Sequence, residues 1–153
     1  MASEAPYTVP LLINGKEITT STTFPVVSPS SHKQIWSASS AALEDVQKAV
    51  DAAQAAFPEW SKTKPAARRD LFLKASDIFT SRAEELGRYM EEETGSAPAF
   101  SSGFNVPLAA EMFKDVAGRC SSVNGVIPTC SDSNTNALVV KEPYGVVLGI
   151  SPW

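Results

Sequence analysis

The sequence has 153 residues, of which 43% are apolar and 20% are charged, with a formal net charge of -4 at pH 7. This is the composition of a globular domain with a core, and it excludes a disordered or fibrous chain. The acidic balance, with no basic cluster beyond the pair Arg68-Arg69, argues against nucleic acid as a partner.

The sequence also shows no sign of export or of membrane insertion. No apolar stretch is long enough to span a bilayer, and Met1-Ala2-Ser3-Glu4 lacks the basic start of a secretory signal. The two cysteines, Cys120 and Cys130, have no metal-ligand or redox spacing. We therefore expect a cytoplasmic protein with reduced thiols and no membrane partner.

Extended segments are predicted in the N-terminal third of the chain, after a flexible tail over residues 1–10. Asn14-Gly15 separates two strand-like flanks, and both residues tolerate positive φ, so residues 11–18 are expected to form a hairpin. Two further strands are predicted at 24–27 and 34–37. Pro25 cannot donate a ladder hydrogen bond, which places the first of these at a sheet edge.

Four helical patterns follow. The first is an apolar face with helical spacing from Val46 to Phe57, which Pro58 is expected to end. The second opens near Pro65. The third starts from a capping-box pattern at 81–84 and stops at Gly95. The fourth runs over 100–116, with a kink or break at Pro107.

The chain then becomes extended again after a loop over 124–136. Strands are predicted at 137–140 and 145–150. The second is apolar on successive residues, which is typical of a strand covered on both faces in a parallel sheet. Together with the helices this predicts an α/β fold.

Residue chemistry alone identifies no catalytic or metal site. His32 is the only histidine and lies in a Ser/Lys-rich turn, where a solvated role is expected. The run Glu91-Glu92-Glu93 fits a solvated helix face better than a cation site. Residues 145–149 do not form the G-x-G-x-x-G pattern of a dinucleotide-binding turn.

Several stretches are similar to the N-terminal part of the aldehyde dehydrogenase superfamily. "LLINGKEI" resembles its opening hairpin, "EDVQKAVDAAQAAFPEWSKTKPAARRDLFLKASDIFTSRAEELGRYMEEETG" its first three helices, and "EPYGVVLGISPW" the strand that enters its Rossmann-type core. The stretch "EETGSAPAFSSGFNVPLAAEMFKDVAG" looks most like the salicylaldehyde and vanillin dehydrogenase branch. This resemblance implies oxidation of an aldehyde, expected to be aromatic, to a carboxylic acid with NAD or NADP as acceptor.

The resemblance also assigns site residues. It places Ile150, Ser151 and Trp153 in the cofactor pocket, and it aligns the Val27 carbonyl and the Glu93 carboxylate with a monovalent-cation site of some members. It assigns no catalytic residue, because the family's oxyanion asparagine, general-base glutamate and nucleophilic cysteine follow beyond the proline-tryptophan pair. We assign no metal ligand.

The resemblance therefore implies that residues 11–153 are a truncated N-terminal segment of the NAD(P)-binding domain, with an incomplete sheet and an oligomerisation strand at 137–142. As written, the chain is expected to be inactive. Three interpretations stay open: a truncated product, the first segment of a longer enzyme that acts on an aldehyde, or a non-enzymatic partner of a full-length homologue. In the last, homo- or hetero-oligomers would form through the oligomerisation strand.

Overall fold

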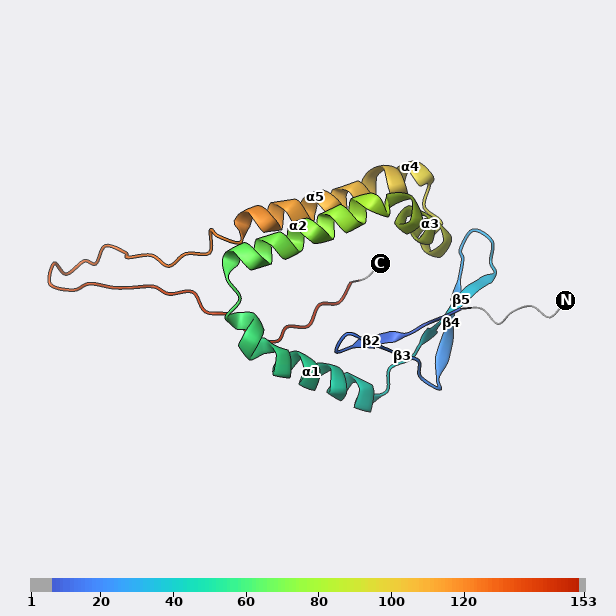
Figure 1. Ribbon diagram of the computed structural model, residues 1–153, viewed down its shortest axis with the longest axis horizontal. Coiled ribbons are helices and arrows are strands. Elements are labelled where there is room, and N and C mark those ends of the chain that lie inside the picture. Colours follow the sequence, from blue (N-terminus) through green and yellow to red (C-terminus); the bar gives the residue numbers. More distant parts are fainter. Residues whose placement is uncertain (1–6, 152–153) are drawn as a thin grey trace.

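The computed structural model describes residues 7–151 and shows an α/β chain with incomplete sheets (Figure 1). Two small sheets lie at one end, a layer of helices extends from them, and an arm formed by residues 121–143 projects from the other end. No helix within 7–151 is long and apolar enough to cross a membrane. The predicted fold class is confirmed.

The predicted hairpin is present. Strands β2 (Leu11–Ile13) and β3 (Lys16–Ile18) pair antiparallel, with Leu11 opposite Ile18. Asn14 has φ 52° and Gly15 has φ 71°, which is the left-handed conformation that a two-residue hairpin turn requires. The short turn thus determines the register of this pair.

The second sheet has three strands in the order β1-β5-β4: β1 (Thr8–Val9), β5 (Gln34–Ser39) and β4 (Thr23–Val27). As predicted, the strand with Pro25 lies at an edge. The tail predicted over 1–10 was too long, because Thr8 and Val9 pair in parallel with Ser37 and Ala38. Residues 1–6 lie outside the described part.

Helix α1 (Leu43–Ser61) continues past Pro58, so the prediction that this proline ends the helix was wrong. Proline removes a single helical hydrogen bond, and its fixed φ is compatible with the last turn. The last carbonyl groups of α1 receive hydrogen bonds from a residue outside the helix: the Arg68 guanidinium donates to the carbonyl oxygens of Trp60 and Ser61 at 2.9 and 3.1 Å. Orphan carbonyls at a helix C-terminus favour such a cationic donor.

Helix α2 (Pro65–Ser81) begins at the predicted proline, and only Arg82 separates it from α3 (Ala83–Thr94). The predicted capping box is absent, because the Ser81 hydroxyl donates back to the Ile78 carbonyl oxygen at 3.0 Å. The end of α3 is as predicted: Gly95 adopts φ 71°.

The fourth helical pattern is interrupted near Pro107, as predicted. It divides into α4 (Pro98–Phe100), a π-helical turn η1 (Ser101–Asn105) and α5 (Val106–Arg119). Pro107 lies in the first turn of α5, directly after the π-helical turn, where the helical hydrogen-bond pattern changes.

Helices α2 and α5 run antiparallel, and their interface is the most extensive one in the helical layer (Figure 1). Ser76 on α2 is fully buried, and Ala110 and Ala117 on α5 are buried. Small side chains allow the two backbones to approach closely. The Phe113 ring fills the remaining space, with centroids 5.2 Å from Phe79 and 6.2 Å from Phe72.

The strands predicted at 137–140 and 145–150 are not formed. The arm contains one bridge, in which Val126 and Val139 exchange backbone hydrogen bonds of 3.0 and 2.9 Å. Residues 145–150 have no ladder partner in the described chain, and the exposed fraction of Leu148 is 87%. A strand needs a neighbour for its N–H and C=O groups, and the sequence pattern of one segment cannot supply it.

Gly87 permits the close contact between α3 and η1. A Cβ atom at this position would lie 2.6 Å from the Ser102 Cβ and 2.9 Å from the Ser102 backbone nitrogen. We expect Gly87→Ala to lower the free energy of unfolding by about 1–3 kcal/mol, measured by urea denaturation with far-UV circular dichroism.

Gly118→Ala is the matched control, since no atom lies within 4 Å of a Cβ built at this helical glycine. This variant should gain about 0.5–1 kcal/mol from helix propensity. Equal stabilities for the two variants would contradict the packing at Gly87.

Candidate functional site

The residues predicted to bind a cofactor lie at the end of the described chain. Ile150 is 84% exposed, Ser151 is also exposed, and Trp153 lies outside the described residues. Ile150 and Ser151 are therefore open to solvent in the described chain, and the cofactor-binding role of all three residues stays a prediction.

The segment just before them has a defined position. Residues 146–148 line a cavity of about 360 Å³ with helix α1 and strand β2, whose apolar contributions include Leu11, Val46 and Val50. The apolar face predicted for α1 thus meets both the hairpin and the end of the chain. Ile150 and Ser151 follow this contact but do not line the cavity.

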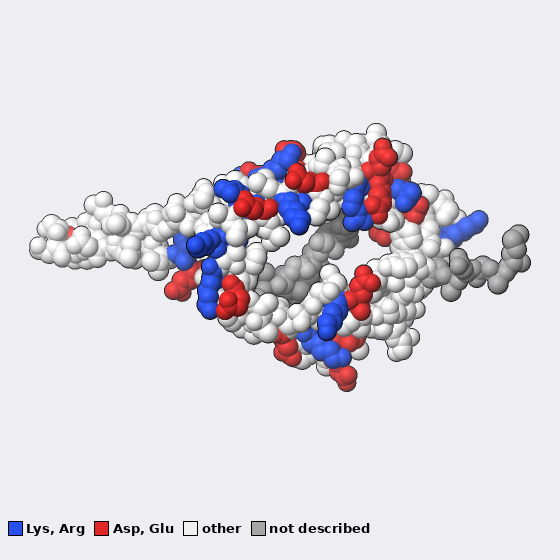
Figure 2. All heavy atoms as spheres, in the orientation of Figure 1, with Lys and Arg blue, Asp and Glu red and all other residues white. Residues whose placement is uncertain are grey.

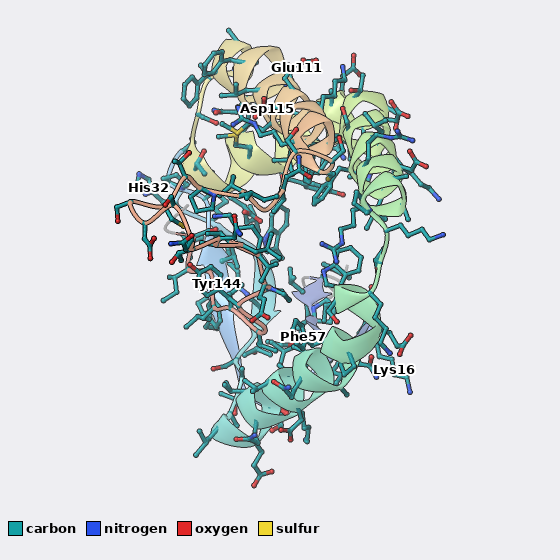
Figure 3. The ribbon with its side chains drawn as sticks, turned by 90° about the vertical axis from the view of Figure 1, so that its left-hand side faces the viewer. Lys16, His32, Phe57, Glu111, Asp115 and Tyr144 are labelled. Atoms are coloured by element: carbon teal, nitrogen blue, oxygen red, sulfur yellow. The ribbon has the colours of Figure 1, made fainter. Side chains whose placement is uncertain are left out.

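Nucleophile and base candidates are dispersed over the fold. His32 is exposed, with φ 54°, in the turn between β4 and β5, and Figure 3 shows it at the margin of the molecule. Cys120 and Cys130 are free thiols whose Sγ atoms lie 3.4 and 3.9 Å from the backbone oxygens of Val116 and Pro128. Within 7–151 no three His, Cys, Asp or Glu side chains are grouped to hold a metal ion.

A cavity of about 550 Å³ lies where the arm joins the ends of α1, α2 and α5, and it is lined by Trp60, Phe72, Arg68, Arg119 and Lys141 among others. The two arginines already have structural partners. Arg68 binds the end of α1 and lies 5.4 Å from the centre of the Trp60 ring, while Arg119 pairs with Asp115 at 2.8 Å. Neither arginine is therefore left free to bind a ligand in this cavity.

The cavity with the most distinctive chemistry lies between the three-stranded sheet and α3. It measures about 310 Å³ and is lined by Tyr7, Val9, Trp36, Tyr89 and Glu93. The indole N–H of Trp36 donates to Glu93 Oε1 at 3.2 Å. The Trp36 and Tyr89 rings meet edge to face, with centroids 6.0 Å apart.

Sequence reasoning did not find this group. Its members come from Tyr7, just before β1, and from β1, β5 and α3, and the first and last of them are more than half the chain apart in sequence. The one local signal was that Tyr89 and Glu93 are four residues apart on a helix and therefore share a face. The sequence places Glu93 in a solvated run of three glutamates, and the family resemblance aligns it with a cation site together with the Val27 carbonyl; neither interpretation predicts its contact with Trp36.

An ion pair on α3 holds one carboxylate ionised. Arg82 donates two hydrogen bonds of 2.8 Å to the two oxygens of Glu85, and the Tyr89 hydroxyl donates a third at 3.1 Å. The Arg82 hydrogen bonds, followed by that of Tyr89, lower the pKa of Glu85 to about 2. This carboxylate holds the hydroxyl group of Tyr89 beside the cavity that the Tyr89 ring lines together with Trp36.

Comparison with known proteins agrees with this arrangement of hairpin, helices and C-terminal segment. The aldehyde dehydrogenase family matches residues 17–153. The chain belongs to the aldehyde dehydrogenase family.

Among its relatives, a vanillin dehydrogenase from a Pseudomonas species (strain HR199) is 41% identical over 147 residues, which are 95% of this chain and 30% of that protein. The structure of a salicylaldehyde dehydrogenase from Pseudomonas putida G7, complexed with salicylaldehyde, superposes with a TM-score of 0.82 at 28% identity, over 89% of this chain and 28% of that one. An NAD-dependent aldehyde dehydrogenase from Sinorhizobium meliloti gives 0.79 at 26% identity, over 87% and 27%. The chain thus spans about 30% of the length of the relatives it matches.

The pKa of Glu85 gives a pH-dependent prediction. Because the folded-state pKa is below the usual value of 4.5, the stabilisation by this carboxylate is fully present above that pH and is lost as the pH falls through about 2. Arg82→Gln removes the largest cause and should raise the pKa of Glu85 towards 4.5, as measured by NMR titration of the carboxyl carbon.

Tyr89→Phe should raise the same pKa by less, since its hydrogen bond is the second cause. Arg119→Gln, which breaks a similar pair with Asp115 on α5, is the control and should leave the titration of Glu85 unchanged. A Glu85 carboxyl that titrates identically in the parent and in Arg82→Gln would refute the assigned cause.

Proposed function

We propose that residues 11–153 form the N-terminal segment of the dinucleotide-binding domain of an NAD(P)-dependent aldehyde dehydrogenase that oxidises an aromatic aldehyde to a carboxylic acid. The observation that carries this proposal is the family match over 17–153 together with 41% identity to a vanillin dehydrogenase. The complex of a relative with salicylaldehyde supports an aromatic substrate.

We further propose that these 153 residues do not catalyse the oxidation by themselves. The reaction needs a thiolate to attack the aldehyde and a base to activate water. The two thiols of the chain are directed to backbone carbonyl oxygens, and His32 lies on a different element from either. Within residues 7–151, neither thiol lies on the same element as the histidine that could serve as its base.

The nucleotide is implied by the family, and the predicted contacts are Ile150, Ser151 and Trp153. In the described part these contacts are exposed and do not surround a ligand. Exposed side chains enclose a ligand poorly, so a nucleotide held here needs contacts in addition to those of Ile150 and Ser151.

An activity assay tests the proposal. The purified chain, mixed with salicylaldehyde or benzaldehyde and with NAD or NADP, should give no rise in the absorbance of the reduced nucleotide above the protein-free blank. A complete vanillin dehydrogenase under the same conditions is the positive control. A steady rise with the chain alone, lost in the double variant Cys120→Ser, Cys130→Ser, would overturn the proposal.

The arm supports a second function, as an interaction partner of a full-length homologue or of another copy of this chain. Leu138 and Val140 are exposed on it, while Val139 holds the single bridge to Val126. Figure 2 shows acidic and basic side chains interspersed over the helices and almost none on the arm. An apolar, unpaired edge of this kind favours addition of a strand from another chain.

This function predicts that a tagged chain captures a purified vanillin dehydrogenase relative, and that Leu138→Asp weakens the capture at least about tenfold by placing a charge in the contact. Leu43→Asp is the matched control, because Leu43 is also largely exposed, at 84% against 70% for Leu138, but lies in the first turn of α1, on another element and far from the arm in sequence. Equal capture by the two variants would exclude residues 137–142 as the interaction strand.

A further inference from the structure

We propose that the cavity lined by Tyr7, Trp36, Tyr89 and Glu93, here called the aromatic cavity, binds a small organic cation that carries a methylated or alkylated ammonium group. This site is independent of the proposed aldehyde chemistry. It is defined by the rings, the carboxylate and the charges that surround this space.

The aromatic cavity presents ring surface from three separate parts of the chain. Trp36 and Tyr89 stand nearly perpendicular, with an interplanar angle of 84°, and so form two adjoining walls. Tyr7 is the third ring, at the rim, and its backbone is held beside β5 because its carbonyl oxygen accepts the Ser37 N–H at 2.9 Å. The face of an aromatic ring carries negative potential and attracts cations, and tryptophan attracts them most strongly.

Glu93 adds a full negative charge to the same space. Its Oε1 is held by the Trp36 indole N–H at 3.2 Å, so the carboxylate and the largest ring keep a fixed relative position. No lysine or arginine lines the cavity among the described residues. Arg88 lies 5.7 Å from the centre of the Tyr89 ring but is not part of the lining. Because no basic side chain of the lining neutralises the Glu93 carboxylate, the cavity favours a cation over a neutral molecule of the same shape.

The ligand atoms available favour an organic cation over a metal ion. Calcium and magnesium require about six or more oxygen ligands, whereas this lining offers one carboxylate and two phenol groups. One of those phenols, Tyr89, already donates to Glu85 at 3.1 Å. Methyl groups around a diffuse positive charge contact ring faces without needing such ligands. The volume of about 310 Å³ suits a ligand of the size of choline.

Choline chloride is the probe, and the indole N–H resonance of Trp36 in a heteronuclear NMR spectrum is the readout. This resonance should shift saturably with choline, while that of Trp60, which lies outside the aromatic cavity, stays in place. Dimethylbutanol, the uncharged carbon isostere of choline, and potassium chloride at equal ionic strength should each produce no saturable shift.

Two variants test the carboxylate and the rim. Glu93→Gln keeps an oxygen for the indole N–H and removes the charge, so the Kd for choline should rise about tenfold. Glu92→Gln, on the same helix but outside the lining, should leave the Kd unchanged. Tyr7→Ala removes an exposed ring at the rim and should also weaken binding, while the backbone bond to Ser37 remains available.

Each contrary result overturns the proposal in its own way. A shift of equal size with dimethylbutanol would make this an apolar pocket without cation preference. A saturable shift with potassium would assign the site to an inorganic ion. An unchanged Kd in a folded Glu93→Gln variant would remove the carboxylate from the site and the proposal with it.

Discussion

The helical layer depends on the close contact between α2 and α5. The buried apolar side chains of the described part, Val106, Ala110 and Ala117, all belong to α5, and the Phe113 ring joins them to α2 through Phe72 and Phe79. Close packing is possible because small residues occupy the line of contact. The π-helical turn before α5 turns the chain so that Ser102 meets Gly87 of α3.

The sheets are joined to this layer by few, specific contacts. Trp36 of β5 donates to Glu93 and packs on Tyr89, both on α3. The end of α3 reaches the turn between β4 and β5, where a Cβ at Gly95 would lie about 3 Å from Ser30 and Pro29. The aromatic cavity forms at this junction, so the candidate ligand site and the contact between sheet and helices involve the same side chains.

The last described segment has the sequence pattern of a strand but is not paired as one. Residues 145–150 carry the pattern of a strand buried on both faces, and the family match extends through them. In the described chain Val146, Val147 and Leu148 line an open cavity with α1 and β2, and Val147, Leu148 and Ile150 stay largely exposed. The relatives are more than three times as long as the matched region.

The sequence by itself determined the local features: the Asn14-Gly15 hairpin, the start of α2 at Pro65, the end of α3 at Gly95 and the family. Each depends on backbone restrictions of one or two residues or on a contiguous motif. Tertiary structure decided the continuation of α1 past Pro58, because Arg68 caps it from another helix. It also decided the aromatic cavity, because its residues meet only after folding, and the absence of strands at 137–140 and 145–150, because pairing requires a partner that a single segment cannot contain.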